Sequence, residues 1–220
     1  TRLRDLSADV TAKAAHFFPP RPTYRFRPVE AIWAPLDDPV AGENPPDGAA
    51  LDFWLSTAPK DSVTIRISDA TGKVVRTMKV SGKQGGNRAW WDLGYDLTKE
   101  AKLRTQPLFT PELRFSPEGK AAPGLGRMGI LAPPGTYSVA LTVGDQRLQQ
   151  PLTILKDPNS GGSMEDIAAQ TSFMTDVTTD INASVDMINA LEVVRSQISV
   201  IKASLSGDTT RKDVTAASDS

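Results

Sequence analysis

The sequence predicts a mainly β protein, with an antiparallel β-sandwich followed by a C-terminal α-helical segment. Three features of the chain lead to this prediction. Short segments between residues 23 and 155 alternate apolar with polar side chains, as strands with one buried face do. Turns rich in glycine and proline separate these segments. After Ser163 the apolar residues recur every three or four positions, which is the period of a helix.

The composition narrows the class of function. The chain has 220 residues, 39% of them hydrophobic, with 17 prolines and 16 glycines, so we expect one modest core with long connections. The formal net charge of −1, with both signs mixed, argues against nucleic-acid binding and polybasic membrane attachment. No apolar run is long enough to span a bilayer. The absence of cysteine excludes disulfides, thiolate metal ligands and cysteine nucleophiles.

The first 22 residues are predicted to form an extended connector. The chain starts at Thr1 without a signal-peptide pattern, which we interpret as a mature or excised piece of a longer polypeptide. The connector ends in His16-Phe17-Phe18-Pro19-Pro20-Arg21-Pro22, where proline fixes φ and removes backbone donors. We expect its two phenylalanines to pin it to a neighbouring surface.

The segment that follows carries the strongest strand signals. Residues 23–28 alternate and predict a first strand, and residues 35–48 are rich in turn formers. Residues 48–56, 63–68 and 74–80 alternate regularly, and Thr71-Gly72 supplies the turn between the last two. These residues therefore predict a half-buried antiparallel hairpin.

Further strands complete the predicted sandwich, which spans residues 23–157. Gly85-Gly86-Asn87 predicts a turn before a strand over 88–93, and two further strands are expected over 136–143 and 148–155. Residues 96–131 contain prolines and glycines without a regular pattern, and a loop this long is often functional or mobile. We count about seven strands, a number typical of a sandwich.

Residues 163–206 predict an amphipathic helix or a helical hairpin. Ser163 is expected to cap it, with Asp166 completing a capping box. One straight helix would extend roughly 65 Å, beyond a sandwich of about 35–40 Å, so part of its apolar side must meet another partner. The Thr/Ser/Asn/Asp-rich stretch 175–186 has weak helix propensity and is a place for a break. Residues 207–220 are predicted to be disordered. The apolar positions are Met164, Ile167, Met174, Val177, Ile181, Val185, Ile188, Leu191, Val194, Ile198, Ile201 and Leu205.

The sequence contains few residues that could form a catalytic, metal-binding or phosphate-binding site. His16 is the only histidine and lies in the connector, so multi-histidine metal sites are excluded and a histidine base is not expected. Asp37, Asp38, Glu43 and Asp47 share one loop, but their spacing matches no calcium loop. Residues 124–129 resemble a phosphate loop in composition only, because they neither follow a strand nor open a helix. We therefore predict no catalytic residue, no cofactor and no metal.

Aromatic residues are the best candidates for a contact site. Trp54, Trp90, Trp91 and Tyr95 could stack on sugars or pack on a partner domain if they are exposed. Trp90 and Trp91 are adjacent and point to opposite faces of a strand, so one of them is expected in the core. The other is open to three roles: a ligand platform, an interdomain contact or a cover over an edge.

Four stretches of the chain resemble a known family. Residues 44–49, 63–76, 86–93 and 132–139 follow the order of the immunoglobulin-like module of the flagellar hook-capping type, in particular the C-terminal region of bacterial sortilin-like and sialidase-like β-propeller proteins. In those proteins a Phe-Pro-Pro-Arg-Pro connector leads from the propeller into the sandwich, and a helical segment follows. The stretch from His16 to Pro22 matches that connector.

The resemblance implies a non-catalytic accessory role. It implies an immunoglobulin-like sandwich that follows a β-propeller in the same polypeptide and packs on it or mediates assembly, in an exported, periplasmic or extracellular bacterial protein. The matched residues are turn and strand signals, so no catalytic residue carries over. Self-association through the helix is a further expectation. Two alternatives remain: a carbohydrate-binding module using exposed tryptophans, and a glycoside hydrolase fragment with a carboxylate pair.

Overall fold

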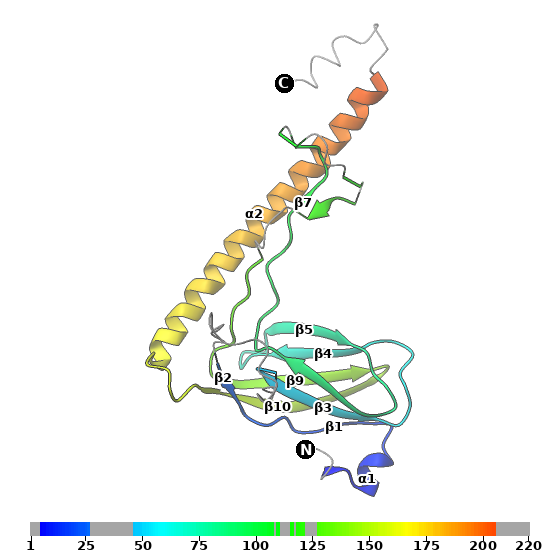
Figure 1. Ribbon diagram of the computed structural model, residues 1–220, viewed down its shortest axis with the longest axis vertical. Coiled ribbons are helices and arrows are strands. Elements are labelled where there is room, and N and C mark those ends of the chain that lie inside the picture. Colours follow the sequence, from blue (N-terminus) through cyan, green and yellow to red (C-terminus); the bar gives the residue numbers. More distant parts are fainter. Residues whose placement is uncertain are drawn as a thin grey trace, which may run out of the picture. The chain divides into compact units, whose positions relative to one another are not determined.

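The computed structural model describes residues 5–26, 46–107, 109–110, 115–116, 118–121 and 127–205. These residues form a β-rich fold that ends in one long helix (Figure 1), as the sequence predicts. They divide into two compact units, within the ranges Thr1–Asp96 plus Gly129–Met174 and Leu97–Met128 plus Thr175–Ser220. The loop with Asp37, Asp38 and Glu43, the glycines 124 and 126, and the tail 207–220 lie outside the described residues.

Two sheets make up most of the first unit. One has three strands in the order β1-β3-β6, and the other has five in the order β2-β10-β9-β4-β5. Figure 1 shows them as two layers, with β5, β4 and β9 in one and β3 and β1 in the other. Their bounds are β1 Ala15–Phe17, β2 Thr23–Arg25, β3 Ala49–Leu55, β4 Val63–Ser68, β5 Val74–Val80, β6 Gly85–Trp91, β9 Gly135–Val143 and β10 Gln146–Lys156.

One strand pair departs from the antiparallel prediction. Every described pair in the two sheets is antiparallel except β10 with β2, where Ile154 lies opposite Thr23 and the strands run in parallel. No hairpin joins these two strands, because they lie at opposite ends of the β-rich region of the sequence. The direction of β2 is therefore set by the path of the chain and not by a local turn.

The inner faces of the two sheets share one hydrophobic core. Leu51 and Phe53 from the three-stranded sheet and Ile65, Val139 and Leu152 from the five-stranded sheet are at most 1% exposed. Most of their neighbours along the strands are exposed or half-buried, as the period of a strand requires, and the exceptions are Asp52 and Ala140, which are also buried. The alternation read from the sequence therefore identifies the buried face correctly.

The connector predicted over residues 1–22 is more ordered than expected. Residues Ala8–Thr11 form a short helix, α1, capped by Ser7, and Ala15–Phe17 form strand β1 beside β3. Phe17 and Phe18 are buried, as expected for residues that pin the segment. A three-residue strand has too little periodicity to be recognised in sequence, so its pairing with β3 was not predicted.

The turn predicted at Gly85-Gly86-Asn87 is instead the start of β6. The loop closes earlier, because the Asn87 side chain accepts from the Lys83 amide at 2.8 Å and donates to the Lys83 carbonyl at 2.7 Å. The Asn87 side chain thus holds the two sides of the loop together. Gly85, at the end of the loop, adopts the positive φ of 95°.

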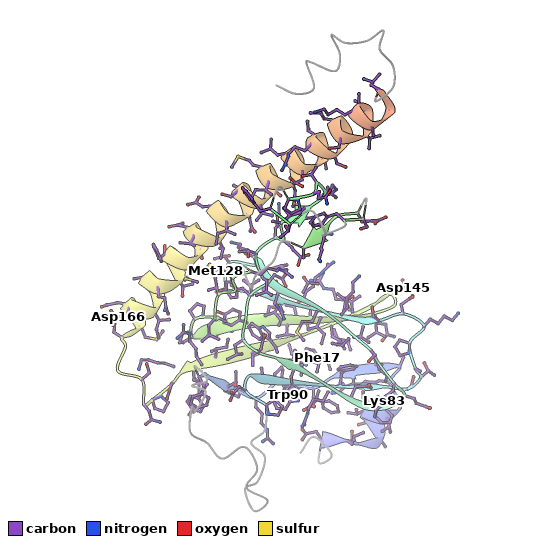
Figure 2. All side chains as sticks on the ribbon, turned by 45° about the horizontal axis from the view of Figure 1, so that its top comes forward. Phe17, Lys83, Trp90, Met128, Asp145 and Asp166 are labelled. Atoms are coloured by element: carbon purple, nitrogen blue, oxygen red, sulfur yellow. The ribbon has the colours of Figure 1, made fainter. Side chains whose placement is uncertain are left out.

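The second unit contains most of the long helix, α2 (Met164–Leu205), and residues 97–128 of the segment between β6 and β9. That segment, predicted as an irregular insert over 96–131, includes the short pair β7 (Lys102–Leu103) and β8 (Lys120–Ala121). Figures 1 and 2 both show the β7 segment running beside α2. The helix is continuous through residues 175–186, so the predicted break does not occur.

The start of α2 agrees with the predicted capping box. Ser163 Oγ accepts from the Asp166 amide at 3.0 Å, and Asp166 Oδ2 accepts from the Ser163 amide at 2.8 Å. Hydrogen bonds that the Ser163 amide and hydroxyl donate to the carboxylate lower the pKa of Asp166, so this group stays charged at the positive end of the helix dipole.

Candidate functional site

The outer face of the three-stranded sheet carries two of the four predicted aromatic residues. Trp54 on β3 and Trp90 on β6 are half-buried and point away from the core side of their strands. Asp52 and Arg88 lie opposite each other in the row between them. We call these four side chains, Asp52, Trp54, Arg88 and Trp90, the tryptophan face. Figure 2 labels Trp90.

An ion pair lies at the centre of this face. Arg88 Nε donates to Asp52 Oδ1 at 2.6 Å, and a second guanidinium nitrogen donates to Oδ2 at 3.2 Å. Asp52 is only 8% exposed, and the hydrogen bond to it raises the pKa of Arg88. The guanidinium carbon also lies 5.7 Å from the ring centre of Trp90, within the range of a cation–π contact. The bidentate pair therefore fixes Arg88 beside the indole.

Two depressions flank the ion pair. The larger has a volume of about 690 Å³ and is lined by Trp54, Asn87 and Lys83, among others. The smaller has about 320 Å³ and is lined by Trp90 and Arg21, among others. Asp52 and Arg88 line both depressions. The face thus offers two concave places, each with an indole ring beside groups that can form hydrogen bonds.

The Trp54 indole has a polar group without a partner in the described part of the chain. Its Nε1 atom is buried and has no hydrogen-bond acceptor there. His16 on β1 lies directly across the strand pair from Trp54, and its ring packs edge-on against Phe18 at 4.7 Å. Burial, and to a lesser degree Lys13, lower the pKa of His16, so this histidine is neutral at pH 7.

Trp91 and Tyr95 do not belong to this face. Trp91 has no exposed surface, and its Nε1 donates to the Gly94 carbonyl at 2.8 Å. Its ring meets that of Tyr137 edge-on at 5.6 Å. Tyr95 packs against the same core, where burial raises its pKa. The structure therefore separates the four predicted residues into a surface pair and a core pair.

No metal centre is found in the part of the chain that the structure describes: no group of three or more His, Cys, Asp or Glu side chains there could hold an ion. In the glycine-rich stretch 124–129, described from Arg127 onward, Arg127 Nε donates to the Thr98 carbonyl at 2.8 Å. Within the described residues, no helix has both the length and the apolar character needed to cross a membrane.

Sequence reasoning missed a polar stripe on α2, formed by Asn182, Asp186, Asn189 and Glu192. Within the second unit it binds the segment 99–105. Asn182 and Asn189 accept from the amides of Lys99 and Lys102, each at 2.7 Å. Asp186 pairs with the Lys99 ammonium at 2.6 Å.

Glu192 completes the stripe by accepting from the amides of Arg104 and Thr105 at 2.7 and 2.9 Å. The signal for this stripe was the polar middle of the predicted helix. The composition of that stretch predicts a weakness in the helix, whereas two of its polar side chains, together with Asn189 and Glu192 beyond it, bind a neighbouring segment of chain.

Comparisons with known proteins do not place the chain in a family. No family model matches the chain, and no curated protein matches it. Among solved structures, a β-glucosidase from Erythrobacter marinus is similar to it with 11% sequence identity and a TM-score of 0.26. The match covers 64% of this chain and 15% of that chain. A similarity this low carries no argument about fold or function.

Proposed function

We propose that the chain is a non-catalytic accessory module, immunoglobulin-like in fold, of an exported bacterial β-propeller protein, where it packs on the propeller or mediates assembly. One observation carries the proposal. Several residues of the family-like stretches close turns, fix the entry to a strand or fill the core, and the interior between the two sheets is filled with apolar side chains.

Two examples illustrate these duties. Asp69 Oδ1 accepts from the amides of Thr71 and Lys73, at 2.9 and 3.1 Å, and so closes the turn of the β4–β5 hairpin. In the Ala-Pro-Pro-Gly-Thr-Tyr stretch, the Tyr137 hydroxyl donates to the Pro133 carbonyl at 2.9 Å and fixes the entry to β9. In both motifs the polar side chain thus has a structural role, in a turn and at the entry to a strand.

The order of the strands supports an immunoglobulin-like arrangement. The chain passes from β3 in one sheet to β4 and β5 in the other, returns to β6 beside β3, and then forms β9 beside β4 and β10 beside β9. Repeated crossing between two sheets around one core is typical of such sandwiches. This supports the finer fold assignment that the resemblance implies.

The tryptophan face is the surface we assign to the propeller. Large aromatic side chains and arginine are the residue types that most often dominate the affinity of protein interfaces, and this face carries two tryptophans and Arg88, which Asp52 holds in place. Leu6, near the start of the described chain, lines the depression beside Trp54. A domain joined upstream would therefore begin close to this face.

A carbohydrate ligand is the second candidate for the same face. Its support is the pair of depressions in which Trp54 and Trp90 lie beside the Asp52–Arg88 pair. Indole rings stack on sugar rings, and guanidinium and carboxylate groups bind hydroxyls. The face thus has the chemistry for a glycan, but its central charges already satisfy each other.

The experiment begins with the reading frame upstream of the Thr1 codon, where we expect a β-propeller. In that full polypeptide, Trp90→Ala should weaken packing on the propeller by at least about tenfold, as hot-spot residues do. Protease sensitivity of the junction and the melting temperature of the propeller measure this. Lys79→Ala, on the exposed side of β5, is the control and should change neither.

Two outcomes would overturn the accessory role. One is a reading frame without a propeller, and the other is a Trp90→Ala protein with unchanged protease sensitivity. Glycan-array binding by the isolated chain that disappears in Trp90→Ala, with the fold intact by circular dichroism, would instead favour the carbohydrate candidate.

A further inference from the structure

The C-terminal half of α2 exposes a regular row of apolar side chains. Met187, Leu191, Val194, Ile198, Ile201 and Leu205 follow one another alternately four and three residues apart. We call them the heptad seam. The first five are between 37% and 62% exposed, and Leu205 is half-buried. Apolar area in water is unfavourable by roughly 25 cal/mol per Å², so a row of this length favours a partner.

Between residues 182 and 192, the other side of this helix contacts a neighbouring segment of the chain. At 100° per residue, Asn182, Asp186, Asn189 and Glu192 lie on the side of α2 opposite the heptad seam. That side binds the segment 99–105 through backbone amides and the Lys99–Asp186 ion pair. Val185, on the same side, is 8% exposed. Among the residues that the structure describes, the second unit therefore binds the polar stripe of the helix and leaves the heptad seam exposed.

We propose that the heptad seam is a parallel coiled-coil interface with a second copy of this chain. Apolar residues at an average spacing of 3.5 place the side chains of one helix into the gaps of an identical helix. Such a seam is complementary to itself when two copies lie in register. Apart from α2, the only helix in the described residues is α1, Ala8–Thr11, which is too short to cover the seam.

The charges beside the seam favour the parallel direction. Arg195 and Lys202 follow the seam on one side, and Ala190, Gln197 and Ser204 follow it on the other. In a parallel pair each side faces the opposite side of the partner, so each basic residue meets an uncharged one. In an antiparallel pair the two basic sides face each other and their like charges repel, with Glu192 on the same helix neutralising part of the Arg195 charge.

This inference deepens the assembly role proposed above but is carried by the helix alone. If the chain were monomeric, the coiled-coil proposal would be wrong, and the proposed packing on a propeller would not be affected. Conversely, a reading frame without a propeller would leave the self-association of the chain intact. The two proposals therefore fail in different experiments.

The first test measures the mass of the full chain by light scattering and sedimentation over a wide concentration range. Wild type should associate, and Ile198→Asp should weaken the association by at least about a hundredfold, because it buries unpaired carboxylates in the seam. Val200→Asp is the matched control: it is also an exposed β-branched residue, two positions away, but lies on the other side of the helix. It should associate like wild type.

The second test determines the direction of the helices. Because the chain has no natural cysteine, a disulfide can form only between the introduced cysteines. Under mild oxidation Met187→Cys and Ile201→Cys should each form disulfide-linked dimers alone, since like positions meet in a parallel pair. An antiparallel pair would instead link the two variants only when they are mixed.

Three results would overturn the proposal. They are a wild-type chain that stays monomeric at about 100 μM, an association that Ile198→Asp leaves unchanged, and cross-links that appear only in the mixture. Equal loss of association in Ile198→Asp and Val200→Asp would also contradict it, because it would make the contact independent of the seam. Helical circular dichroism of both variants shows that they remain folded.

Discussion

Glu192 is 4% exposed and yet remains a charged carboxylate. Burial alone would raise its pKa, but hydrogen bonds from the Arg104 and Thr105 amides, from the Thr105 hydroxyl and the charge of Arg195 outweigh burial and lower it. Arg195 donates to Glu192 at 2.6 Å, so the carboxylate has both a backbone partner and a counter-ion. One side chain thereby fixes the path of residues 104–105 against the helix.

We expect Glu192→Ala to release this segment. Loss of a buried carboxylate that accepts several hydrogen bonds costs about 2–3 kcal/mol, and the cost falls on the second unit. Hydrogen exchange at the Arg104 and Thr105 amides should accelerate by about 30-fold or more. Asp176→Ala removes an exposed carboxylate from the same helix and should leave both amides unchanged. Equal exchange in both variants would show that Glu192 does not hold the segment.

The same protection should depend on pH. The folded pKa of Glu192 is depressed, so its contribution to stability is present above the pKa of the unfolded chain and is lost as the pH falls through the folded value. In wild type, opening of the segment should therefore become easier at acidic pH, whereas Glu192→Ala should lack this dependence. If the pH dependence of segment opening persisted in Glu192→Ala, another titratable group would be responsible for it.

At the scale of secondary-structure elements, turn residues set the pairing of the strands, and side-chain contacts keep α2 continuous. The β4–β5 hairpin closes with Gly72 at a φ of +86° and Asp69 bonded to the turn amides. In α2, the hydroxyls of Thr178, Thr179 and Ser184 donate to carbonyls of the preceding turn. Such residues have low helix propensity, and tertiary contacts through Asn182 and Asp186 offset it.

The hairpin gives a prediction about two glycines. Gly72→Ala should destabilise the first unit by about 1–2 kcal/mol, because an alanine is strained at positive φ even though its Cβ has free space. Gly86→Ala, also with free space but without positive φ, should be neutral or slightly stabilising. Urea unfolding followed by tryptophan fluorescence measures both. Equal effects of the two substitutions on the free energy of unfolding would mean that backbone strain at position 72 does not determine the stability of the turn.

At the scale of the whole molecule, one apolar core joins the two sheets of the first unit. Trp91, Phe53 and Ile65 have at most 1% of their surface exposed and come from both sheets. The three-stranded sheet could not persist without the other, because its inner face would lie in water. The tryptophan face depends on this core, since β3 and β6 carry Leu51 and Trp91 inward and Trp54 and Trp90 outward.

Ile65→Asp should unfold the first unit. It places a carboxylate at a position with no exposed surface on β4, between β5 and β9, at a cost of more than about 4 kcal/mol. That is a large part of the stability of a typical domain. Arg66→Asp adds the same group on the exposed side of the same strand and should cost at most about 1 kcal/mol. An unchanged melting temperature in Ile65→Asp would mean that β4 faces the other way.

Much of the fold can be predicted from the sequence. The bounds of β4 and β5, the capping box at Ser163 and the start of β9 near Gly135 all follow local rules that the structure confirms. For the adjacent tryptophans, alternation predicts that one is buried but not which one. The pairing of Trp91 with Ala49, a buried position of β3, decides it, and a pairing register is a non-local property.

The sequence alone determined the periods, turns and caps of this protein, because each depends on residues a few positions apart. Only the tertiary structure decided that β2 runs parallel to β10, that residues 99–105 lie along the polar stripe of α2, and that the heptad seam is left uncovered. Each of these depends on which distant residues meet. That choice is made by the burial of apolar area over the whole chain, which no local pattern specifies.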